Sequence, residues 1–110
     1  MKLPNVEKAV IADAKIINYL LSSTHTEGKD KAMVFLSHGF RAEEPETLKA
    51  SLLKVVQGNE ALRTIVTIHG QKYVIEGDLE TPDGRGIYIR TIWIVDRGGT
   101  IPRFVSAYPA

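Results

Sequence analysis

The sequence contains no cysteine among its 110 residues. Disulfide bonds, thiolate metal sites and cysteine nucleophiles are therefore excluded. It also lacks an apolar run near the roughly 20 residues that a membrane-spanning helix needs. The N-terminal stretch MKLPNVEKAVIADAK has no apolar segment of the kind that signal peptides carry. We therefore expect a cytoplasmic protein with no membrane segment.

The chain also has almost no excess of positive over negative charge. The chain has 14 Lys and Arg against 13 Asp and Glu, so its net charge is +1 with His neutral. Bulk charge does not indicate a nucleic-acid partner, and any RNA contact must come from local clustering of cations. The length fits one domain, which we expect to divide into a helical half at about 1–58 and a sheet half at about 60–110.

Motifs that would assign a chemistry directly are absent. There is no Gly-rich phosphate loop, no dinucleotide-binding fingerprint and no nucleophile elbow. The three histidines, His25, His38 and His69, do not have the close spacing of metal ligands. The acidic stretch GDLETPDG is better interpreted as a hairpin than as a calcium loop. We therefore expect neither a cofactor nor a metal.

The first half of the chain has the apolar periodicity of helices. One helix is predicted in AKIINYLLS after Asp13, and a second from about Thr26 to about His38. The clearest is RAEEPETLKASLLKVVQGN, in which Pro45 fits the first turn. Three helices are therefore expected before Asn59.

After Asn59 the period changes to that of strands. The tetrapeptides TPDG and DRGG are strong turn sequences. Four strands are expected, near 62–69, 72–80, 86–95 and 101–108. This pattern predicts an α+β fold, with N-terminal helices packed on a four-stranded antiparallel β-meander. The residues expected to be largely buried are Leu20, Phe35, Leu52, Leu53, Val56, Ile89 and Trp93.

Two groups of residues are candidates for chemistry on a phosphodiester. His25 precedes the second helix, and Lys29 and Lys31 follow it closely. A histidine that titrates near neutral pH can move a proton, while a nearby cation stabilises charge in the transition state. The alternative is a solvated loop histidine among surface lysines, and spacing alone leaves both interpretations open.

The last strand, RFVSAYP, carries the second group. Alternation places Ser106 and Tyr108 on one face, together with Phe104. Their hydroxyls could bind a scissile phosphate or orient a 2′-hydroxyl, or they could simply form the polar face of an edge strand. In the third strand, Arg90 lies in a largely apolar row, where a charge needs a partner or a solvated cleft.

Four stretches carry a resemblance to a known family: LPNVEKAVI, INYLLSSTHTEGKDKAMVFLSHGF, KYVIEGDLETPDGR and RTIWIVDRGGTIPRFVSAYP. They resemble a bacterial domain-of-unknown-function family that occurs as stand-alone proteins and at the C-termini of polymorphic toxins. At the level of fold, helices followed by a meander resemble the ribonuclease superfamily of barnase, EndoU, the tRNase colicins and RelE.

The resemblance to these ribonucleases implies a site. Toxins of the superfamily often use a His and a basic residue near a helix, with a Thr and a Tyr on the last strand. It implies four catalytic residues and two substrate-binding residues: His25, Lys31, Ser106 and Tyr108, then Arg90 and Lys29. Ser106 stands where Thr is usual. The expected activity is metal-independent endoribonuclease cleavage of RNA by 2′-hydroxyl attack.

Such a toxin is expected to have a small antitoxin or immunity protein as its partner. A non-catalytic binding module, either the antitoxin or immunity half of such a pair or an inactive relative of the nuclease fold, is the competing hypothesis. Immunity partners are typically acidic, and the net charge of +1 weighs mildly against that role.

Overall fold

The computed structural model describes residues 1–21 and 29–110, and it describes side chains in the second part from Ala32 onward. A short 3-10 helix, η1 (Val6–Lys8), precedes α1 (Asp13–Lys15), which continues into the π-helical η2 (Ile16–Leu20). Helices α2 (Lys29–Ser37) and α3 (Pro45–Gly58) follow. No helix in these described ranges is long and apolar enough to cross a membrane.

The second half forms one sheet of four strands. They are β1 (Arg63–Thr67), β2 (Gly70–Leu79), β3 (Ile87–Asp96) and β4 (Pro102–Pro109). Each strand pairs antiparallel with the next, in the order β1-β2-β3-β4. The predicted α+β fold, with helices first and a four-stranded antiparallel meander last, is confirmed.

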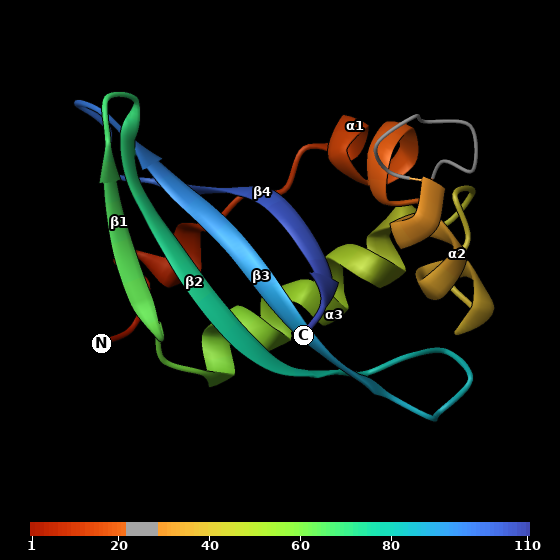
Figure 1. Ribbon diagram of the computed structural model, residues 1–110. Coiled ribbons are helices and arrows are strands. Elements are labelled where there is room, and N and C mark those ends of the chain that lie inside the picture. Colours follow the sequence, from red (N-terminus) through yellow and green to blue (C-terminus); the bar gives the residue numbers. More distant parts are fainter. Residues whose placement is uncertain (22–28) are drawn as a thin grey trace.

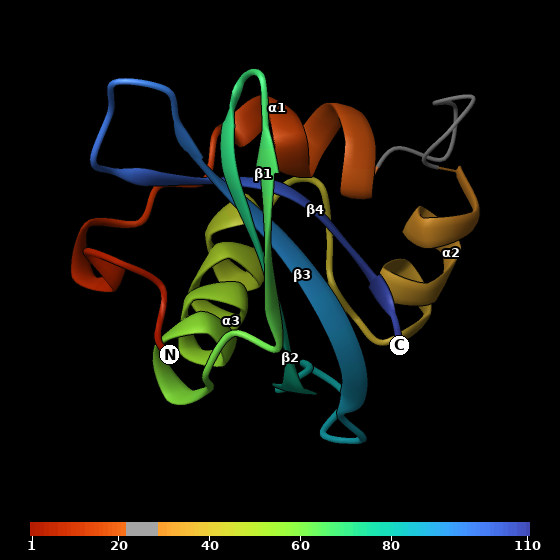
Figure 2. The same cartoon turned by 60° about the vertical axis from the view of Figure 1, so that its left-hand side comes forward.

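Helix α3 lies across one face of the sheet, whereas α1 and α2 lie toward one end of it (Figures 1 and 2). Pro45 begins α3, where its missing N–H and fixed φ are tolerated. The helix buries Leu48, Leu52, Val55 and Val56, which recur at helical spacing. In both views the opposite face of the sheet carries no described helix, and we call it the open face.

The core forms between α3, the N-terminal helices and the covered face of the sheet. Trp93 and Phe104 meet edge to face there, with ring centroids 5.3 Å apart. Of the residues expected in the core, six are fully buried: Leu20, Phe35, Leu52, Val56, Ile89 and Trp93. Leu53 is less buried than expected: it is partly buried and packs against the core. One residue along a helix is a rotation of about 100°, which turns Leu53 away from the face that Leu52 buries.

A β-bulge in β4 contradicts the expected strand face. Trp93 pairs with Phe104, but Ile92 pairs with Ser106, so Val105 is an extra residue. An inserted residue reverses the alternation of side chains beyond it. Phe104 therefore faces the core with Trp93, while Ser106 lies on the opposite face. The expectation that Ser106 and Tyr108 share a face with Phe104 is wrong, although they share a face with each other.

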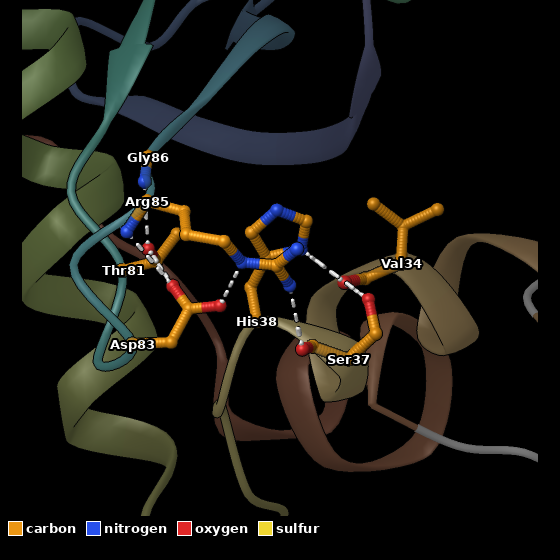
Figure 3. A network of polar contacts seen from close by, with 7 residues as sticks. All are labelled: Val34, Ser37, His38, Thr81, Asp83, Arg85 and Gly86. Atoms are coloured by element: carbon orange, nitrogen blue, oxygen red, sulfur yellow. Dashed lines mark hydrogen bonds and ion pairs between the residues drawn. The ribbon is translucent and has the colours of Figure 1, made fainter.

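The loop between β2 and β3 is tied to the end of α2 (Figure 3). Thr81 Oγ1 donates to Asp83 Oδ1 at 2.6 Å, and Arg85 Nε donates to Asp83 Oδ2 at 2.7 Å. The Arg85 guanidinium also donates to the Ser37 carbonyl at 3.1 Å, and the Asp83 N–H to the His38 carbonyl at 3.2 Å. These bonds satisfy carbonyls at the helix C-terminus, where intrahelical donors run out.

Candidate functional site

Half of the predicted site falls on residues whose side chains lack a described position. His25 lies outside the described residues, and Lys29 and Lys31 are described only as part of the α2 backbone. The convergence of His25 and Lys31 with the last strand therefore stays a prediction. The rest of the predicted site lies on β3 and β4, whose side chains the structure describes.

Arg90 and Tyr108 are brought together on the open face of the sheet. Arg90 on β3 pairs with Tyr108 on β4 and with Glu76 on β2. Residues directly opposite each other in an antiparallel pair have neighbouring side chains on the same face. Arg90 Nε donates to Glu76 Oε2 at 2.6 Å, and the guanidinium carbon lies 6.0 Å from the Tyr108 ring centroid. An acid, a cation and a phenol thus form one row across three strands.

Glu76 is the partner that the charge of Arg90 was expected to need. The hydrogen bond to Glu76 is the main cause that raises the pKa of Arg90, and Tyr108 adds to it. The side chain of Arg90 is 37% exposed, whereas that of Glu76 is 12% exposed. Glu76 therefore holds the guanidinium in place, and the guanidinium is still accessible to an anion on the open face of the sheet.

Ser106 contacts a residue that the sequence analysis did not single out. The Tyr19 hydroxyl, on η2, lies 3.3 Å from Ser106 Oγ, and either oxygen can donate. Tyr19 is partly buried against the core, which fixes the direction of its ring. Ser106 and Tyr108 are two residues apart on one strand, so roughly 7 Å separates their backbones. The Tyr19–Ser106 pair therefore adjoins the row formed by Glu76, Arg90 and Tyr108.

A groove runs between the first helical segment and β4, beside Ser106. Its volume is about 520 Å³, which is within the range of small-molecule sites. Seven residues line it: Ala12, Ala14, Lys15, Asn18, Tyr19, Val105 and Ser106. Lys15 Nζ lies 5.6 Å from the Tyr19 ring centroid, a cation–π distance. The groove thus presents an ammonium, an amide and two hydroxyls to a ligand.

One local signal in the sequence points to this groove. Lys15 and Tyr19 have the i, i+4 spacing that places two side chains side by side on a helix. The apolar residues of the segment predict the helix but not this polar pair. The other residue missed, Glu76, had no local signal, since only strand pairing places it opposite Arg90.

The arrangement suits binding of a phosphate or a ribose. Lys15 and Arg90 supply positive charge, and the hydroxyls of Tyr19, Ser106 and Tyr108 supply neutral hydrogen-bonding groups. In the described ranges, no group of three or more His, Asp or Glu side chains converges as metal ligands would.

Comparison with known proteins identifies the family. Residues 2–110 match the family described as a domain of unknown function, DUF6883. The match spans nearly the whole chain, so the protein belongs to this family, and the expected membership in a domain-of-unknown-function family is confirmed. No curated protein matches the chain in sequence.

The fold has a solved counterpart. The chain is similar to one chain of a structure described as a contact-dependent growth inhibition toxin–immunity protein complex from Klebsiella pneumoniae 342. The TM-score is 0.71 and the sequence identity 17%, with 92% of this chain and 99% of that chain covered. At so low an identity, the likeness establishes a shared fold. A shared fold alone does not establish a shared function.

Proposed function

We propose that this domain is a metal-independent endoribonuclease toxin that cleaves RNA by attack of the 2′-hydroxyl. The observation that carries the proposal is the gathering of hydroxyls and cations at β4. Ser106 lies beside Tyr19 and the groove that also holds Lys15, and Tyr108 lies beside Arg90. A phosphodiester in its transition state carries extra negative charge on its oxygens, and fixed cations and hydroxyl donors stabilise that charge.

In the proposed reaction, the 2′-oxygen forms a bond to phosphorus while the bond from phosphorus to the 5′-oxygen breaks. The 2′-hydroxyl loses a proton and the leaving 5′-oxygen gains one, and His25 is the proposed group for proton transfer. Ser106 and Tyr108 donate hydrogen bonds to the phosphate, and Arg90, Lys29 and Lys31 supply positive charge. The products are a 2′,3′-cyclic phosphate and a 5′-hydroxyl.

A small immunity protein or antitoxin is the proposed protein partner. The fold similarity to a chain from a toxin–immunity complex supports this partner, as does the resemblance to domains at the ends of polymorphic toxins. An inhibitor that covers the groove beside Ser106 would prevent RNA from reaching it. The open face of the sheet has no described helix that an inhibitor would have to displace.

The second candidate is a non-catalytic binding module, such as an immunity partner or an inactive relative of the nuclease. One observation favours it: the charge of Arg90 is already paired with Glu76 at 2.6 Å. A phosphate would have to compete with that carboxylate. In this alternative, the row formed by Glu76, Arg90 and Tyr108 recognises another protein.

The test is incubation of the purified domain with total cellular RNA in the presence of a chelator. We expect cleavage to persist and to leave 2′,3′-cyclic phosphate ends. His25→Ala should lower the rate by about 10²–10⁴-fold, the usual contribution of general acid–base catalysis. The matched control is His69→Ala, since His69 is exposed in the β1–β2 turn. This control should keep wild-type activity.

Lys31→Ala should weaken RNA binding as well as cleavage, and the loss should shrink at high salt because phosphate contacts are screened. The outcome that contradicts the enzyme is a wild-type domain that is inert on RNA and harmless in cells with its partner removed. Such a result would leave the binding module as the function.

A further inference from the structure

The outer edge of β1 is open and apolar. Residues 63–67 pair with β2 on one side and with no other described strand on the other side. Just before β1, the Ala61 N–H donates to the Met1 carbonyl at 2.7 Å, so the open stretch begins at Arg63. Val66 is 81% exposed and Ile68 is 80% exposed, and Leu62 and Ile65 are also exposed. Edge strands usually carry lysine, proline or a bulge that blocks pairing with another chain. Here the strand has one charge, Arg63, and no proline.

The other edge of the sheet is protected by the chain itself. The Val10 N–H donates to the Pro102 carbonyl at 3.0 Å, and the Phe104 N–H donates to the Val10 carbonyl at 2.9 Å. The segment that contains Val10 thereby forms a short parallel bridge along β4. Among the described strands, β1 is thus the one whose outer edge offers backbone donors and acceptors, over residues 63–67.

The sequence around β1 is complementary to itself. It reads RTIVT over residues 63–67. Antiparallel pairing of two copies about a two-fold axis at Ile65 gives these opposite residues: Ile65 with Ile65, Thr64 with Val66, and Arg63 with Thr67. Each large apolar side chain then faces an apolar or β-branched one, and Arg63 faces no cation. Centring the axis on Thr64 instead would place Ile65 opposite Arg63.

We propose that β1 is a homodimerisation edge, where a second copy of this chain pairs antiparallel about Ile65. The two sheets then form one continuous sheet. A two-fold interface uses the same surface on both copies, which is the property that the pattern around Ile65 has. Tyr19, Ser106 and Tyr108 lie at the opposite edge of the sheet, so the dimer leaves the candidate site of each copy open. The proposed dimer does not depend on the proposed function.

Pairing of one short strand buries less surface than a standard stable interface. The dimer should therefore be in concentration-dependent equilibrium with the monomer, which sedimentation velocity measures directly. Ile65→Lys places two ammonium groups opposite each other and should weaken dimerisation about tenfold or more. Met33→Lys is the matched control, since Met33 is an exposed apolar residue on α2. This control should dimerise as the wild type does.

Cysteine cross-linking tests the register, because the natural chain has no cysteine. Residues directly opposite in an antiparallel pair have Cβ atoms roughly 4.5–5.5 Å apart, close to what a disulfide needs. Ile65→Cys should therefore cross-link to its own copy under mild oxidation. Val66→Cys is the control: the two copies of Val66 are diagonal neighbours, roughly 7–8 Å apart, and should cross-link at least about tenfold more slowly.

Exposure alone predicts the reverse order, since Ile65 is 40% exposed and Val66 is 81% exposed. Faster cross-linking of Val66→Cys, or equal rates, would overturn the proposed register. A chain that stays monomeric at every concentration would overturn the dimer and leave β1 as an edge for a different protein. Aggregates larger than a dimer would also contradict the proposal, because a two-fold interface closes on itself.

Discussion

Arg90 and Tyr108 face each other across β3 and β4, with the guanidinium carbon 6.0 Å from the centroid of the ring. Glu76 holds the same guanidinium from the other neighbouring strand, at 2.6 Å. The cation is therefore fixed between an acid and a phenol. In the proposed enzyme, a phosphate has to draw Arg90 away from Glu76, so this carboxylate sets the strength of anion binding.

The first prediction follows from that competition. Glu76→Gln keeps the size of the side chain and removes its charge, so Arg90 becomes free for a phosphate. We expect RNA affinity to rise about threefold to tenfold at low salt, and Arg90→Gln to lower it. Fluorescence anisotropy of a labelled single-stranded RNA, measured over a range of salt concentrations, checks both changes.

Glu80→Gln is the matched control for this experiment. Glu80 is an exposed acid that pairs with Lys54 at 2.8 Å and lies outside the Glu76–Arg90–Tyr108 row. If Glu80→Gln raises affinity as much as Glu76→Gln does, the gain reflects net charge, and the specific competition at Arg90 is refuted.

The second prediction concerns the hydroxyl of Ser106. Ser106→Ala removes a proposed phosphate donor and should lower the rate of RNA cleavage about 10²-fold. Ser106→Thr keeps the hydroxyl and restricts its rotation, so it should keep or raise activity. Initial rates on one RNA substrate check the order Thr, Ser, Ala. Equal activity of all three variants would remove Ser106 from the site.

Tyr19→Phe separates catalysis from packing at the same place. The ring that packs against the core stays, and only the hydroxyl that lies 3.3 Å from Ser106 Oγ is lost. We expect a loss of activity smaller than that of Ser106→Ala, with the unfolding midpoint nearly unchanged. A large drop in stability without any change in rate would show that Tyr19 has a structural role alone.

The third prediction concerns a buried threonine in β3. Thr91 is fully buried, donates to the Ile75 carbonyl at 2.7 Å and accepts from Trp93 Nε1 at 2.8 Å. Thr91→Val preserves the shape but leaves the Trp93 N–H without its acceptor. The free energy of unfolding should fall by about 1–3 kcal/mol. Urea denaturation measures it, and the exposed Thr100→Val should change it by less than about 0.5 kcal/mol.

The fourth prediction is a pH dependence of stability from Asp83. The hydrogen bond from Thr81 is the main cause that lowers the pKa of Asp83, and Arg85 contributes further. A carboxyl whose pKa is lower in the folded state stabilises the fold at any pH above its ordinary pKa of 3.8. This stabilisation is lost as the pH falls toward the pKa of the folded state.

Asp83→Asn should therefore lower the melting temperature at neutral pH. The difference from wild type should stay constant down to about pH 5 and shrink between about pH 4 and pH 2. Thermal unfolding followed by circular dichroism over this range checks the prediction. A difference that grows on acidification would mean that Asp83 is destabilising, contrary to the contacts it makes.

The sequence by itself determined the order and type of the main elements. Pro45 and the apolar period after it predicted α3, and the turns TPDG and DRGG predicted where the last strands separate. These signals are local, because capping, turn geometry and periodicity depend on residues a few positions apart. They also predicted correctly that Ser106 and Tyr108 share a face, since both follow the bulge.

Only the tertiary structure decided which residues meet. Tyr19 and Ser106 are 87 positions apart, and Glu76 and Arg90 are 14 apart, so no local pattern connects them. The bulge at Val105 depends on how β4 pairs with β3. Because of this bulge, Phe104 faces the core and Ser106 lies on the open face. Strand pairing and the packing of the first helical segment against β4 are long-range. Local propensity therefore predicts the helices and strands, while strand register and helix packing decide which side chains meet in the candidate site.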